Sequence, residues 1–279
     1  MKKRTLSDRN LEQFSLHLLE EEKSTATCEK YLRDVRQFRK FAGKKAVEKE
    51  LVIAWKKQLQ ERGYAVRSIN SMLASVNSLL RFLNWQDCKV KNIRLQRQTY
   101  CPEEKELTKA EYLRLIEASE RDRQLNLVIQ TICATGIRVS ELQYFTVEAL
   151  HRGAVTVNCK AKTRTIFIPG KLKKQLLKYA RQEKIASGSV FLGKKKKPLD
   201  RSMIWRRMKA LCKVAGVAET KVFPHNLRKL FAFTFYHYEK DIAKLADILG
   251  HSSINTTRIY IMSTGVEHRK KIEKLGLVV

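Results

Sequence analysis

Five side chains that suit phosphate chemistry stand in three separated segments: Arg138, His225, Arg228, His251 and Tyr260. The segments are 134–142 (ATGIRVSEL), 224–228 (PHNLR) and 249–260 (LGHSSINTTRIY). An arginine guanidinium donates two parallel hydrogen bonds to phosphate oxygens in a fixed plane, which a lysine ammonium cannot do. The two arginines therefore suit the negative charge that develops on a phosphodiester when it is transferred to a side-chain hydroxyl.

Tyr260 is the candidate for that hydroxyl. Tyrosine ordinarily has a pKa of about 10, so it needs positive neighbours and a proton acceptor to attack at neutral pH. Arg138 and Arg228 can supply the charge, and His225 can supply the acceptor. Glu141 lies one turn after Arg138, where it either orients that arginine or is an ordinary surface glutamate.

In this order and spacing, the three segments resemble the tyrosine recombinase (phage integrase) family, and the resemblance covers nearly the whole chain. It implies that His225 exchanges a proton with the tyrosine and that His251 hydrogen-bonds the phosphate. It also implies that a lysine in a hairpin turn protonates the departing 5′ oxygen. By turn position that lysine is Lys160, with Lys162 as the alternative. Lys229 stands where many members carry a second histidine.

The resemblance implies a site-specific recombinase that cleaves and rejoins DNA through a covalent 3′-phosphotyrosine and a Holliday junction, in integration, excision or resolution. The implied partner is double-stranded DNA, bound by a homotetramer that exchanges C-terminal tails across two duplexes. The need for an accessory DNA-bending protein stays open. No cofactor and no metal are implied, because the arginines do the work of two magnesium ions in other nucleases, and we expect activity in a chelator. The chain resembles the compact, Xer-like or transposon type.

Two other classes of function share part of this pattern. A type IB topoisomerase or a telomere resolvase also forms a 3′-phosphotyrosine, but the topoisomerase reseals the strand without exchange between duplexes. A non-catalytic DNA-binding protein on an integrase scaffold is the other alternative. Against this alternative, the five positions named first and Lys160 all carry residue types that can perform the cleavage chemistry.

The charge of the chain points to a polyanionic partner. It holds 57 Lys and Arg against 28 Asp and Glu, for a formal net charge of +29. Residues 1–100 contain 22 of the basic and 11 of the acidic residues, so both halves are basic, as suits a clamp around a duplex. Charge alone does not separate DNA from RNA.

The six cysteines lack metal-ligand spacing, and no apolar segment reaches membrane length. We therefore expect a cytoplasmic protein without a membrane partner.

The elements that must position these residues follow from periodicity. Apolar residues at helical spacing predict four helices in the first hundred residues, with start signals near Ser7, Thr25 and Ser68. We therefore assign 1–95 to a helical core-binding domain. The helical period is lost over 93–106, which also contains a proline, and this indicates a linker, assigned to 96–106.

The catalytic domain is predicted to span 107–279. Thr108 and Glu111 form a capping-box pair at its first helix. Alternating apolar residues predict a β-hairpin within 154–169, and a third short strand is predicted at 190–192. The segment from about 262 to 279 is basic and then apolar, as expected of an oligomerisation tail.

The predicted fold class is mainly α with a small β-sheet. The resemblance implies a two-domain, C-shaped DNA clamp, built from an N-terminal helical (SAM-like) core-binding domain and a mixed α/β integrase-type catalytic domain.

Overall fold

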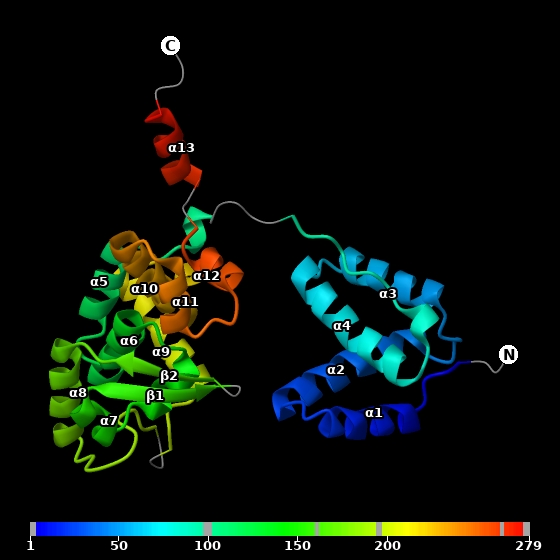
Figure 1. Cartoon of the computed structure of the whole chain (residues 1–279), viewed down its shortest axis with the longest axis horizontal. Helices are drawn as coiled ribbons and strands as arrows, with labels where there is room; N and C mark the ends of the chain where they lie inside the picture. The colour runs from blue at the N-terminus through cyan, green and yellow to red at the C-terminus, as the bar shows by residue number, and fades with distance from the viewer. Residues whose placement is uncertain (1–3, 97–101, 160–161, 194–196, 263–264, 276–279) are drawn as a thin grey trace. The chain divides into compact units, whose positions relative to one another are not determined.

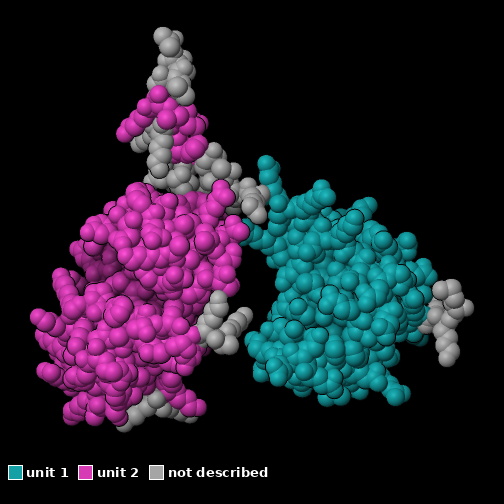
Figure 2. Space-filling view, viewed as in Figure 1, with its two compact units in different colours: residues 1–97 teal, residues 98–279 magenta. Residues whose placement is uncertain are grey.

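The computed structural model describes residues 4–96, 102–159, 162–193, 197–262 and 265–275. The chain divides into two compact units, Met1–Arg97 (unit 1) and Gln98–Val279 (unit 2), which Figure 2 shows in two colours. The division falls within the segment where the sequence loses its helical period. No helix in these ranges is long and apolar enough to cross a membrane.

Unit 1 is built from helices (Figure 1). In its described part they are α1 (Asp8–Glu20), α2 (Thr25–Ala42), α3 (Lys49–Glu61), α4 (Val66–Phe82) and the 3₁₀ turn η1 (Gln86–Cys88). Their apolar faces meet around Phe14, Phe38 and Trp55, which are almost fully buried. The Ser7 hydroxyl caps α1 by accepting a hydrogen bond from the backbone amide of Asn10, as its sequence signal predicts. By contrast, α4 begins two residues before its predicted start at Ser68, without a side-chain cap.

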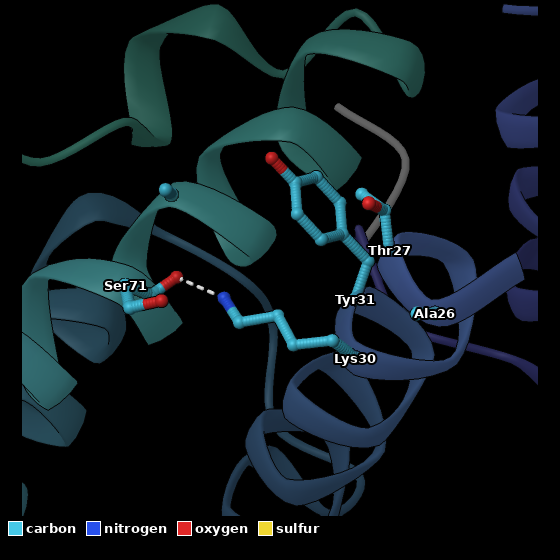
Figure 3. A pocket seen from close by; sticks show the side chains of 6 residues that line it. Ala26, Thr27, Lys30, Tyr31 and Ser71 are labelled. Carbon is cyan, nitrogen blue, oxygen red and sulfur yellow. Dashed lines mark hydrogen bonds between the residues drawn. The ribbon is translucent and has the colours of Figure 1, made fainter. Parts of the chain in front are cut away.

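A hollow between α2 and α4 contains a lysine that is bound to protein atoms. Figure 3 shows Lys30 reaching across it to donate a hydrogen bond to the Ser71 carbonyl, at 2.6 Å. The same ammonium lies 2.8 Å from the carboxylate of Asp34, which is only 3% exposed, and 2.9 Å from Ser75 Oγ. Lys30 thereby compensates a buried charge and ties α2 to α4, which makes it part of the scaffold.

Unit 2 contains further helices and one β-hairpin. Its described α-helices and strands are α5 (Lys109–Ala118), α6 (Arg123–Thr135), α7 (Val147–Arg152), β1 (Ala154–Cys159), β2 (Lys162–Phe167), α8 (Gly170–Gln182), α9 (Arg201–Ala215), α10 (Pro224–Glu239), α11 (Ile242–Leu249), α12 (Ile254–Tyr260) and α13 (Gly265–Glu273). Its described 3₁₀ turns are η2 (Glu103–Lys105), η3 (Val139–Tyr144) and η5 (Glu219–Lys221). Both signals of the capping box at α5 are present, because the Thr108 hydroxyl and the Glu111 carboxylate each accept from the other's backbone amide.

The predicted hairpin is confirmed, and the predicted third strand is wrong. β1 and β2 pair antiparallel, with Val157 opposite Arg164. Within 190–192, the β-pairing is limited to an isolated bridge between Leu192 and Pro198. Ser189, just before this segment, forms another isolated bridge with Thr146. The apolar pattern there reflects burial of Val190 and Phe191 in the core rather than strand pairing.

Helix packing in unit 2 brings distant parts of the sequence together. α10 packs against α6, α11 and α12, and α11 also contacts β2 of the hairpin (Figure 1). As a result, the C-terminal ends of α6 and α11 lie near the first turns of α10. The predicted site segments begin or end at these helix termini.

Gly136, which ends α6, is expected to be intolerant of a side chain. Its φ of +64° is unfavourable for other residues, and a Cβ would overlap the Phe231 ring. We expect Gly136→Ala to lower the free energy of unfolding by about 2–4 kcal/mol, from backbone strain and overpacking together. Gly216, which ends α9 with φ +58° and no atom within 4 Å of an added Cβ, is the matched control. Gly216→Ala should lower the free energy of unfolding, measured in urea, by only about 1 kcal/mol. Equal losses of stability in the two variants would contradict the packing argument.

Candidate active site

The C-terminal ends of two helices hold two of the predicted arginines. α6 closes at Gly136 and α11 at Gly250, both with left-handed backbone. Arg228 donates from Nη1 to the Gly136 carbonyl and from Nη2 to the Leu249 carbonyl, the latter at 2.6 Å. Arg138 Nη2 donates to the Gly250 carbonyl at 3.2 Å. Carbonyls at a helix C-terminus lack partners within the helix and carry its negative dipole end, so they favour bound cations.

Arg228 is a buried cation in a fixed orientation. It is 2% exposed, and burial together with the charge of Arg138 lowers its pKa to about 10, so it is protonated at neutral pH. Its Nη2 also lies 3.0 Å from His251 Nε2. Its Nε is buried and has no hydrogen-bond partner among the described residues. A buried donor without a partner indicates a position suited to a further acceptor, such as a phosphate oxygen.

The ring of Tyr260 contacts both predicted histidines. The ring centroids of His225 and Tyr260 are 5.0 Å apart in an edge-on arrangement, and those of His251 and Tyr260 are 4.9 Å apart. The Arg228 guanidinium carbon lies 5.9 Å from the centre of the same tyrosine ring. Tyr260 is 9% exposed and closes α12. The structure thus gathers a hydroxyl-bearing ring, two imidazoles and a cation.

His251 is held as a neutral imidazole. A guanidinium has no acceptor, so Nε2 must accept from Arg228, and Nδ1 then carries the proton and donates to Thr257 Oγ1 at 2.9 Å. Burial, and then the positive charges led by Arg228, lower the pKa of His251 to about 4. Thr257 is fully buried one turn before the tyrosine. Its role in fixing this tautomer was not predicted from the sequence.

His225 is also expected to be neutral at physiological pH. Although part of its ring is exposed, desolvation by the surrounding protein, followed by the charges of Arg228 and Lys229, lowers its pKa. Lys229, which directly follows Arg228 in the sequence, has its ammonium 3.1 Å from a carboxylate oxygen of Glu106. A neutral imidazole beside a tyrosine is able to accept a proton.

Glu141 is buried against Arg138. It is 3% exposed, and its Oε1 lies 3.0 Å from Arg138 Nη1 while its Oε2 accepts from the Arg138 amide at 2.7 Å. Oε2 also accepts from Arg164 Nη2 at 2.7 Å. This pairing was not predicted from the sequence, because Arg164 lies 23 positions away on β2.

Most of the predicted residues are therefore brought together. Those that gather are Arg138, Glu141, His225, Arg228, His251 and Tyr260. Lys160 lies outside the described residues, and the alternative, Lys162, is the first residue of β2. The choice between these two lysines stays a prediction.

Acid unfolding tests the geometry around His251. Because its pKa is lowered to about 4 in the folded protein, only the unfolded chain binds this proton between about pH 6.5 and about pH 4. Stability should therefore be fully present above about pH 6.5 and should fall as the pH drops through this window. The lowered pKa of His225 adds to the fall in the same direction.

The matched variant for this test is His251→Gln, which keeps an acceptor for Arg228 without a titrating ring. We expect the urea midpoint of the variant to change less than that of the wild type between about pH 7 and about pH 5. The same pH dependence in both proteins would show that His251 is not held neutral.

Comparison with known proteins identifies the class of this chain. Residues 105–265 match the model of the phage integrase family, and residues 11–87 match that of the phage integrase N-terminal SAM-like domain. The chain therefore belongs to the phage integrase family of tyrosine recombinases.

Individual relatives support this assignment over the whole chain. A tyrosine recombinase XerA from Pyrococcus furiosus is 30% identical over 288 aligned positions, which cover 100% of this chain and 98% of that protein. A crystal structure of XerA recombinase shares 25% identity with a TM-score of 0.55, and covers 98% of this chain and 99% of its own. A lambda integrase tetramer bound to a Holliday junction has a TM-score of 0.73 at 18% identity, covering 90% and 76% of the two chains, which shows a common fold.

Proposed function

We propose that this protein is a site-specific recombinase that cleaves and rejoins double-stranded DNA by forming a covalent 3′-phosphotyrosine at Tyr260. The observation that carries the proposal is the contact of this ring with both His225 and His251, near the buried guanidinium of Arg228. Homology to the XerA recombinase over the full chain supports recombination as the reaction.

The reaction requires one bond to form and one to break. The Tyr260 oxygen attacks the scissile phosphorus while its proton passes to His225, and the bond from phosphorus to the 5′ oxygen breaks. Arg138 and Arg228 stabilise the charge on the nonbridging oxygens. A bound phosphate is negative and opposes the effect of the arginines on the neighbouring imidazoles, so it favours proton uptake by His225. Lys160, or alternatively Lys162, supplies the proton that the departing 5′ oxygen needs.

We assign His251 a role in phosphate binding through Arg228. Its Nε2 already accepts from the guanidinium, and its Nδ1 is committed to Thr257. In this neutral form it helps to fix the plane of the guanidinium, while protonation in the complex would turn Nε2 into a second donor to the phosphate.

The domain boundaries that we propose are 1–95 for core binding, 96–106 for the linker and 107–279 for catalysis. A formal net charge of +29, spread over both halves of the chain, supports contact of both domains with the DNA backbone. We propose the compact Xer-like or transposon type, acting in the cytoplasm. Four of the cysteines, Cys28, Cys88, Cys133 and Cys212, are free thiols, in agreement with a reducing compartment.

We further propose that the tail from about 262 to 279 joins subunits into a tetramer on two duplexes. In α13 and just after it, Ile272 and Leu275 are 53% and 62% exposed, as expected of apolar residues that dock elsewhere. The lambda integrase with the same fold forms a tetramer on a Holliday junction, which supports the assembly.

Charged substitutions in the tail test this assembly. We expect Ile272→Asp with Leu275→Asp to keep binding to a single DNA site but to lower assembly of the two-duplex complex at least about tenfold. The control, Lys274→Asp, places the same aspartate on the exposed residue between them. Native mass spectrometry or gel shifts on paired sites measure this, and undiminished assembly of the double variant would refute tail docking.

Strand exchange separates the recombinase from its alternatives. Two labelled duplexes that carry the DNA flanking the protein's own gene should yield exchanged products. Relaxation of supercoiled plasmid without exchange would favour the topoisomerase alternative. Tight binding with no covalent species would favour a DNA-binding protein without catalytic activity.

A further inference from the structure

Arg164 connects three separated parts of the active-site region. It lies on β2 and is largely buried, with a side-chain exposure of 12%. Its Nη2 donates to Glu141 Oε2 at 2.7 Å, so it binds the segment that follows α6. It also packs against Gly250, where an added Cβ would overlap its guanidinium. This glycine directly precedes His251, so Arg164 contacts both the segment that holds Arg138 and the segment that holds His251.

The carboxylate that Arg164 holds is shared with a predicted catalytic arginine. Glu141 Oε1 lies 3.0 Å from Arg138 Nη1, and Oε2 accepts both from the Arg138 amide and from Arg164. One buried carboxylate therefore fixes two guanidiniums. The charge of Arg164 is also among those that lower the pKa values of Arg228 and His251, which places it within electrostatic reach of the site.

We propose that Arg164 is a positioning residue for strand cleavage, which holds one oxygen of Glu141 so that the other oxygen aims Arg138 at the scissile phosphate. This inference rests on the proposed recombinase function. Arg138 keeps 35% of its side chain exposed, so its guanidinium has room to move. Without Arg164, the buried carboxylate loses a charged donor and draws Arg138 into a closer pair, which occupies N–H groups that the phosphate needs.

Direct contact with DNA is the competing role for Arg164. Its Nε is buried and has no hydrogen-bond partner among the described residues, so a donor is left over after Glu141 is satisfied. An arginine that touched the phosphate itself would act independently of Glu141. A double-mutant cycle between the two residues separates these roles, because only a shared pathway gives non-additive effects.

The first measurement is single-turnover cleavage of a nicked duplex at saturating protein. We expect Arg164→Met, which keeps the length of the chain but no donor, to slow cleavage about 10–100-fold, with the DNA Kd within about threefold of wild type. Arg164→Lys, which retains one charged donor to Glu141, should restore the rate to within about fivefold. The control is Arg181→Met, an exposed arginine of α8, which should cleave at the wild-type rate.

The second measurement is the cycle with Glu141→Gln. In that background Arg164→Met should slow cleavage by less than about threefold further. Multiplicative effects, or an unchanged rate for Arg164→Met alone, would overturn the inference. Should Arg164→Met fail to fold, Arg164→Gln takes its place in the cycle. The wild type is tested for the covalent adduct in the same assay. If the wild type forms no adduct, the proposed function fails. If it does and the Arg164 variants do not behave as expected, only the inference about Arg164 fails.

Discussion

Tyr260→Phe is expected to abolish the covalent protein–DNA adduct and to slow strand cleavage by at least about 10⁴-fold, because the attacking oxygen is removed. The phenylalanine ring keeps the contacts with both imidazoles, whose centroids lie 5.0 and 4.9 Å from that of the tyrosine. The fold and the affinity for DNA should therefore stay close to those of the wild type. Single-turnover cleavage and gel-shift titration on the same duplex measure the two quantities separately.

Tyr238 provides the control for this substitution. It is 88% exposed on α10, and Tyr238→Phe removes a hydroxyl from the same unit without touching the site. Its adduct yield should match that of the wild type. An adduct that persists in Tyr260→Phe at a comparable rate would mean that another side chain is the nucleophile.

The second large effect is expected for Arg228→Lys. The guanidinium donates to the Gly136 and Leu249 carbonyls and to His251, while keeping Nε for a further acceptor. A lysine ammonium cannot reach these partners in one plane. We therefore expect cleavage to fall about 10²–10³-fold and the free energy of unfolding to fall by about 2–4 kcal/mol.

An arginine at the terminus of another helix, outside the candidate site, gives a matched control for Arg228. Arg114 donates to the Ala215 carbonyl at 2.9 Å and the Gly216 carbonyl at 3.3 Å, at the end of α9. Arg114→Lys should lower stability in urea unfolding but leave the cleavage rate of the folded protein unchanged. A full cleavage rate in Arg228→Lys would contradict the assignment of this arginine to the phosphate.

Local sequence signals predicted the main elements because they depend on a few neighbouring residues. The Ser7 cap, the capping box at Thr108 and the hairpin strands all occur as their signals indicate. The start of α4 at Val66 was not predicted because no side-chain cap marks it. The irregular segment at 190–192 was not predicted because Val190 and Phe191 are buried in the core without strand pairing.

The partners of the site residues depend on packing and could not be predicted in the same way. Spacing suggested that Glu141 orients Arg138, but its second partner, Arg164, is 23 positions away on another element. Similarly, the Thr257 hydroxyl that fixes the tautomer of His251 looks like an ordinary helix residue in the sequence. The Glu141–Arg164 contact forms only when the hairpin packs beside the segment that follows α6, and the His251–Thr257 contact only when α12 packs against α11.

The most direct test of the central claim is to locate the covalent bond to DNA. The protein is incubated with a nicked duplex from the flank of its own gene, the adduct is digested, and the modified peptide is sequenced by mass spectrometry. The proposed mechanism predicts a nucleotide linked through its 3′ phosphate to Tyr260. A link to any other residue, or through a 5′ phosphate, would contradict it.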